Sequence, residues 1–313
     1  MNFKLEMMSV KLPFHLIIVV GLFSLFIQDV NAQGCSDAGV CTIDSFKPHD
    51  HNEGHELQNT FKAGLNFGAA DYDISVFGTY LDYRREVNDR LSVDAKLTTL
   101  SQSGNDISTF GLSDIYVNGN YKLGKNASLT LGFKIPLSDA NKKENGLALP
   151  MDYQSSLGTF DLVLGIGYSI KKLQLLAALQ QPLTQNNNEF LSNQYDSDSP
   201  LSEFQSTNQF KRSGDLLLRV SYPLNLGKKL IFTPSLLPIY HLSNDKFTDI
   251  TGIENEIDGS QGLTLNWNTY FDYYINEKHA LQLSLGSPFI VRETRPDGLT
   301  RSFVANLEYR INF

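Results

Sequence analysis

Residues 301–313, the last thirteen of the chain, read RSFVANLEYRINF and decide the fold. Every second residue from position 303 to position 313 is apolar or aromatic, and the residues between them are polar apart from Val304. Successive side chains of an extended chain point to opposite faces, so this alternation predicts a β-strand with one apolar and one polar face. An ordinary edge strand of a soluble protein is the alternative interpretation.

The same segment resembles the closing strand of bacterial outer-membrane β-barrels. In those proteins a terminal aromatic residue, preceded by aromatic and aliphatic residues at alternate positions, is recognised by the barrel-assembly machinery. The resemblance implies that Tyr309 and Phe313 form the insertion signal. It also implies that barrel-assembly machinery and outer-membrane lipid are partners of the chain.

The front of the chain has the pattern of a secretory signal peptide. Lys4 and Lys11 give the chain a basic start before an apolar run at 16–27, and the small residue Ala32 suits cleavage before Gln33. The run is too short to span a membrane, and no later apolar stretch is longer. Residues 1–32 are therefore interpreted as a signal peptide, 33–55 as a periplasmic leader that contains Cys and His, and 56–313 as a transmembrane β-barrel.

The composition fits such a barrel and excludes some functions. A net charge of −8 argues against a nucleic-acid partner. The mean hydropathy of −0.21 is low because only alternate strand residues of a membrane barrel face lipid. The 14 Tyr and 20 Phe are enough for aromatic girdles at both membrane interfaces.

The alternation of apolar and polar residues recurs in twelve segments: 57–67, 75–87, 91–98, 114–123, 127–137, 160–170, 173–185, 215–222, 230–244, 263–273, 281–291 and 303–313. Short links follow every even-numbered segment, whereas most of the other links are longer and polar. This pattern predicts an all-β fold, a twelve-stranded antiparallel transmembrane β-barrel with up-and-down meander topology. Short turns and both termini are then expected in the periplasm of a cell whose outer membrane holds the barrel.

Two local features refine this prediction. Pro234 and Pro238 predict a bulge in the ninth strand, because proline has no N–H for the ladder. Six tyrosines lie near the periplasmic ends of strands and are expected to form an aromatic belt. They are Tyr83, Tyr121, Tyr168, Tyr222, Tyr273 and Tyr309.

The alternation of outward apolar and inward polar positions in each strand predicts which charged residues line the lumen. They are Lys62, Asp82, Arg84, Asp94, Lys96, Asp114, Lys122, Lys134, Asp161, Asp215, Arg219, Asp272, Glu308 and Arg310. Their mixed signs predict no ion preference, and they either line a water-filled path or pair and fill the lumen. The aromatic-containing loop 185–214 either folds inward as a constriction or remains a mobile outer loop.

The leader contains the only two cysteines of the chain, Cys35 and Cys41, followed by His49, His51 and His55. A disulfide between the cysteines suits an oxidising periplasm. A metal site formed by these Cys and His residues is a second interpretation, and lipidation of Cys35 is a third. No cofactor is expected elsewhere.

One short motif favours an enzyme. His241-Leu242-Ser243-Asn244 resembles the His-x-Ser-Asn pattern of outer-membrane phospholipases and lipid A deacylases, in which the His is a base for a Ser nucleophile. Parity places His241 and Ser243 toward the lumen, away from the outer leaflet, unless a bulge shifts the register. Catalysis at these two residues is therefore an alternative, and the chain is expected not to be an enzyme.

Three stretches, 112–116, 131–137 and 156–161, resemble the outer-membrane transporters grouped under the phenol-degradation meta-cleavage pathway. The chain departs from that pattern at Pro136-Leu137-Ser138, where the family has Pro-Thr-Gly, and its start resembles outer-membrane proteins of the Bacteroidetes. The resemblance implies a channel or passive transporter for small solutes, with apolar or aromatic solutes among the candidates. A structural or interaction barrel with a filled lumen and a lipid hydrolase are the alternatives.

Overall fold

The computed structural model of the chain describes residues 43–48, 59–298 and 302–313. Within this part, no helix is long and apolar enough to cross a membrane. Twelve long strands make up most of it. They are β1 (Asn59–Ala69), β2 (Ser75–Glu86), β3 (Leu91–Gly104), β4 (Ile107–Leu123), β5 (Ala127–Pro136), β8 (Asp161–Ile170), β9 (Leu173–Pro182), β10 (Asp215–Ser221), β12 (Leu230–His241), β15 (Gly262–Tyr274), β16 (His279–Ile290) and β17 (Phe303–Asn312).

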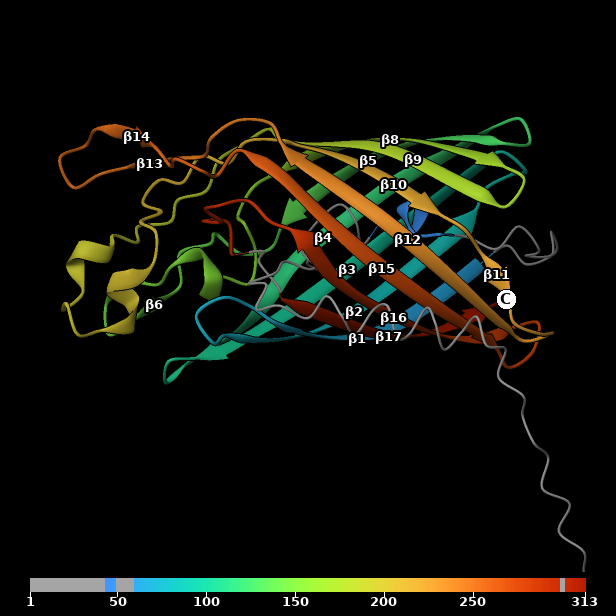
Figure 1. The fold of residues 1–313 in the computed structure, drawn as a ribbon, viewed down its shortest axis with the longest axis horizontal. Coiled ribbons are helices and arrows are strands. Elements are labelled where there is room, and N and C mark those ends of the chain that lie inside the picture. The colour runs from blue at the N-terminus through green and yellow to red at the C-terminus, as the bar shows by residue number, and fades with distance from the viewer. Residues whose placement is uncertain (1–42, 49–58, 299–301) are drawn as a thin grey trace, which may run out of the picture. The chain divides into compact units, whose positions relative to one another are not determined.

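The long strands form one closed antiparallel sheet. Each pairs with the next long strand along the chain, and the last strand, β17, pairs with β1, so that Leu307 lies opposite Leu65. Figure 1 shows these long strands tilted and side by side. The predicted twelve-stranded, up-and-down antiparallel barrel is confirmed. Closure removes the free sheet edges that would otherwise leave backbone N–H and C=O groups without partners in lipid.

The two faces of the sheet differ as the alternation predicts. On β5, Leu129, Leu131 and Phe133 are exposed on the outside, whereas Thr130 and Lys134 are buried inside. The other long strands continue this exposed apolar band around the barrel. Because soluble proteins do not expose apolar patches of this extent, the band is the surface that meets lipid.

The two ends of the barrel differ in their connections. At one end, called here the turn end, the strands are joined by short links at 87–90, 124–126, 171–172, 222–229 and 275–278. The opposite end, called the loop end, carries long connections at 137–160, 183–214, 242–261 and 291–302. Figure 1 shows β6, β13 and β14 at the loop end and the C-terminus at the turn end. All six belt tyrosines are exposed on the outside, by 37 to 47%.

The shorter elements lie in these connections and in the segment before β1. The short strands are β6 (Lys143–Glu144), β7 (Leu147–Ala148), β11 (Leu224–Asn225), β13 (Lys246–Thr248) and β14 (Glu254–Glu256). The 3₁₀ turns are η3 (Asp44–Phe46), η4 (Met151–Tyr153), η5 (Ser192–Gln194) and η6 (Pro200–Glu203).

The predicted bulge at Pro234 or Pro238 is wrong. The register of β12 against β15 is continuous through both prolines. Against β10 the pairing is interrupted at Leu218, opposite Pro238, and it resumes at Val220 in the same register. Pro238 has no N–H for the ladder, but it adds no extra residue, so no bulge forms. The parity of β12 therefore holds up to His241.

Candidate functional site: the barrel lumen

The charged residues predicted for the lumen face the interior. Twelve of the fourteen are buried, while Arg84 and Lys122 are partly exposed. Many of them form ion pairs with one another; Lys134 Nζ, for example, lies 2.9 Å from Asp161 Oδ2 with both side chains fully buried. A lumen of paired charges presents no single-sign ladder to a passing ion.

Residues 43–48, called here the plug segment, lie inside the barrel. They belong to the stretch 33–55 that the sequence analysis assigns to a periplasmic leader. Ile43 and Phe46 are each 1% exposed and pack against an apolar belt on the lumen wall. Gly165 of β8 leaves room for the Phe46 ring, since a Cβ atom at this glycine would collide with it. The belt residues are Tyr116, Val163, Ala178, Leu217 and Leu237.

Ion pairs hold the plug segment on the opposite wall. Asp44 pairs with Lys62 and with Arg84, and Lys47 Nζ lies 2.9 Å from Glu308 Oε2. Burial opposes the charge on Lys47, but Glu308 outweighs it and raises the pKa of the Lys47 ammonium. These pairs involve β1, β2 and β17, whereas the apolar belt lies on β4, β8, β9, β10 and β12. The plug segment therefore bridges the lumen from wall to wall.

The long loops fold inward at the loop end. Phe190, Leu201 and Phe204 of the connection 183–214 are buried in one apolar cluster with Val76 and Leu100, which face the lumen from β2 and β3. The inward-folded alternative for this loop is therefore the one found. Its aromatic residues pack on the inner wall and cover this part of the barrel mouth.

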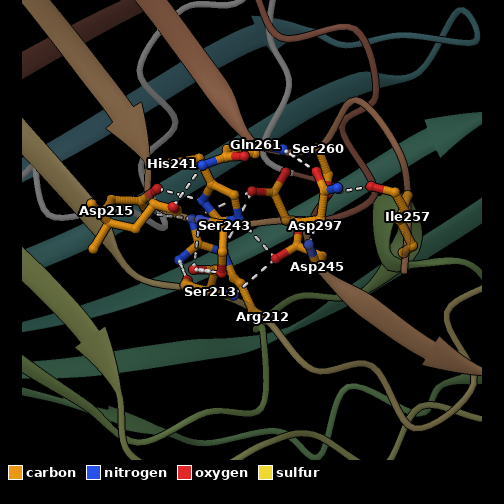
Figure 2. Close-up of polar contacts among 12 residues, drawn as sticks. Arg212, Ser213, Asp215, His241, Ser243, Asp245, Ile257, Ser260, Gln261 and Asp297 are labelled. Carbon is orange, nitrogen blue, oxygen red and sulfur yellow. Dashed lines mark hydrogen bonds and ion pairs between the residues drawn. The ribbon is translucent and has the colours of Figure 1, made fainter. Parts of the chain in front are cut away.

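Six charged residues at the loop end, called here the mouth cluster, connect three of these loops. They are Arg212, Asp215, His241, Asp245, Arg292 and Asp297, and Figure 2 shows their centre. Arg212 and Arg292 both pair with Asp297, at 3.4 and 2.9 Å. Burial opposes ionisation of Asp297, but Arg292 and Arg212 outweigh it and lower the pKa of this carboxyl group to about 2.

His241 lies between two carboxylates of the mouth cluster. Its Nδ1 lies 2.7 Å from Asp215 Oδ1, and its Nε2 lies 2.8 Å from Asp245 Oδ1. An ionised carboxylate only accepts hydrogen bonds, so both ring nitrogens donate and the ring is an imidazolium. The cluster then balances three cations against three anions, which is what burial of so many charges requires.

This geometry contradicts the hydrolase alternative. Neither nitrogen of His241 is free to accept a proton from a nucleophile, because both are hydrogen-bonded to carboxylates. Ser243 was expected to face the lumen, but the strand ends at His241, and Ser243 is exposed with its Oγ 2.8 Å from Ser213 Oγ. The base and nucleophile of the proposed pair are therefore not in contact.

Some predicted residues lie outside the described part of the chain. These are Cys35, Cys41, His49, His51 and His55, so the disulfide, metal and lipidation interpretations stay predictions. The plug segment was not predicted from the sequence. The available signal is the pair of apolar residues Ile43 and Phe46, and the leader is too short for any periodicity to show.

The fold and the polar lumen define an outer-membrane-type β-barrel. No family model matches the chain, and no curated protein matches it in sequence. Among solved structures it is similar to an outer-membrane channel from Pseudomonas putida F1, with a TM-score of 0.58 and 14% identity over 85% of this chain and 100% of that one. The NanC porin is more distant, with a TM-score of 0.45 and 10% identity over 82% of this chain and 98% of that one. The CymD monoaromatic hydrocarbon channel has a TM-score of 0.42 and 9% identity over 82% of this chain and 89% of that one. The resemblance to outer-membrane channels is thus confirmed for the fold.

Proposed function

We propose that this protein is a passive outer-membrane channel for small solutes. The observation that carries the proposal is the lumen, which has a mostly polar wall with one apolar belt and is filled across its width by a segment of only six described residues. That segment is held by side-chain contacts which can form and break. A barrel with a purely structural role would not need a plug segment that can leave the lumen.

The orientation follows from the two ends of the barrel. Short turns and the tyrosine belt are typical of the periplasmic end of outer-membrane barrels, and long loops are typical of the extracellular end. Asn59 and Phe313 pair through their backbone groups at the turn end, so both ends of the barrel chain belong on the periplasmic side. In this orientation the inward-folded loops cover the extracellular mouth.

The plug segment also bears on the solute. When Phe46 leaves its seat, the lumen wall presents an apolar belt shaped to accept an aromatic ring, with Tyr116, Leu217 and Leu237 around it. An apolar or aromatic solute of similar size can replace the phenyl ring there. This supports apolar or aromatic solutes as candidates for transport.

A structural barrel with a filled lumen is the second candidate, and it is favoured by the many contacts of the plug segment. Uptake into proteoliposomes separates the two candidates. Vesicles that contain the full processed chain are placed in an isosmotic solution of a small neutral sugar, and their swelling is followed by light scattering. A channel predicts faster swelling than protein-free vesicles show; equal rates would contradict the proposed function and leave the structural barrel.

A further inference from the structure

The lumen wall carries a neutral patch of four asparagines on the strands β1, β17 and β15, with β16 between the last two. Asn66 of β1 lies directly opposite Asn306 of β17. Asn306 lies opposite Ser284 of β16 and donates to its Oγ at 3.1 Å. Asn268 and Asn266 follow on β15, two positions apart and facing the same side. These four residues are called here the asparagine patch.

The amide oxygens of the asparagine patch lack protein partners. Within the described residues, no donor reaches the Oδ1 atom of Asn66, Asn266, Asn268 or Asn306, although all four atoms are buried. Asn66 is 3% exposed and Asn266 is fully buried. A buried acceptor without a hydrogen bond is costly, and native proteins keep few of them. Four on one patch of wall indicate a common purpose.

Two glycines on neighbouring strands make room for amides of the asparagine patch. Gly78 lies opposite Asn66, and Gly286 lies opposite Asn268. A side chain at either glycine would collide with the amide across from it, so each amide lies flat over its glycine. Asn66 and Asn268 therefore fill the space over these glycines, and their amide oxygens are buried in the plugged lumen without a donor.

We propose that the asparagine patch is a solute-binding subsite for neutral molecules that carry several hydrogen-bond donors, such as hydroxyl groups. Unpartnered carboxamide oxygens accept from O–H or N–H groups, and the absence of charge within the patch gives no advantage to ions. Several charged lumen side chains, such as Lys134 and Asp161, pair with one another elsewhere on the wall. This inference rests on the proposed channel function and adds the class of solute.

The asparagine patch is suited to transport of a solute rather than to high-affinity binding. A subsite in a channel must bind well enough to draw the solute in and weakly enough to release it. Each neutral hydrogen bond changes an equilibrium by only about two- to tenfold, which is the range such a subsite needs.

The test uses uptake of two labelled solutes, each at micromolar concentration, into proteoliposomes that contain the full processed chain. Erythritol is a neutral polyol, and trimethylamine N-oxide is a small neutral acceptor without a donor. The double variant Asn66→Leu/Asn306→Leu removes two acceptors at nearly constant volume. Its erythritol uptake is expected to fall about four- to hundredfold, while its N-oxide uptake stays at the wild-type rate.

The control variant is Asn312→Leu, which makes the same change on β17 at the turn end, outside the patch. It should transport both solutes as the wild type does. If the double variant does not refold, Asn268→Leu on β15 carries the same expectation with a smaller loss. Unchanged erythritol uptake in a folded patch variant overturns the subsite. Absence of any uptake by the wild type overturns the channel function instead.

Discussion

The mouth cluster makes a strong prediction about His241. Its side chain is 1% exposed and donates to both Asp215 and Asp245, so replacement by Phe leaves two buried carboxylates without this cation. Breaking a buried pair in this way costs about 3–5 kcal/mol. Asp215 is 11% exposed, which favours the lower end of that range. A cost of about 3 kcal/mol raises the population of opened loops about a hundredfold.

Tryptic cleavage after Arg212 measures that population. The Arg212 side chain is only 4% exposed and lies within the mouth cluster, so trypsin reaches it when the loop 183–214 opens. When opening and closing are fast compared with cleavage, the cleavage rate follows the equilibrium population of the open form. His241→Phe should therefore be cleaved after Arg212 about a hundredfold faster than the wild type, as followed by mass spectrometry of the fragments.

The matched control is His279→Phe at the turn end, where the ring stacks on Tyr309 and contacts no loop of the mouth. Its cleavage after Arg212 should equal that of the wild type. If His241→Phe is cleaved within about twofold of the wild-type rate, the mouth cluster does not hold the loops.

Three further predictions concern the plug segment, the mouth cluster and the leader. Gly165→Leu fills the space of the Phe46 ring, so this variant should swell faster in proteoliposome assays than the wild type, and an unchanged or slower rate would count against the plug. The pKa of Asp297 is lowered to about 2, so its ionised form stabilises the loops above about pH 4, and this contribution is lost as the pH falls toward 2. Pepsin should therefore cleave the loops faster as the pH falls across that interval. In the variant Asp297→Asn the cleavage rate should depend less on pH. The periplasmic protein should show no labelling by a thiol reagent before reduction if Cys35 and Cys41 form a disulfide, and two labelled thiols would exclude that bond.

Most of the fold was predictable because a membrane barrel repeats one rule along the chain. The period-two alternation assigned twelve strands and the inward face of the wall, and the short links assigned the turn end. The alternation did not predict that β3 continues past residue 98 or that β4 begins before residue 114. Asn105 and Asp106 form the tight turn there with φ values of 52° and 60°, which Asn and Asp tolerate, and these two residues were the available signal.

The candidate site was less predictable because it depends on contacts between distant residues. Lys47 and Glu308 are 261 positions apart, and no local pattern links them. The aromatic residues of the loop 183–214 indicated packing, but only the apolar inner surface near Val76 determines that the loop folds inward. Likewise, no sequence pattern marks which lumen asparagines find partners, since that depends on the register of neighbouring strands.

The central claim is that the lumen conducts when the plug segment leaves it, and single-channel recording in planar bilayers tests this most directly. Phe46→Ala removes the buried ring that anchors the segment, and a loss of about 3 kcal/mol shifts the equilibrium toward the open lumen about a hundredfold. The wild type should show rare current steps, and Phe46→Ala should show steps of the same size that are open far more of the time. Absence of current steps from both proteins, each shown to be folded, would contradict the account.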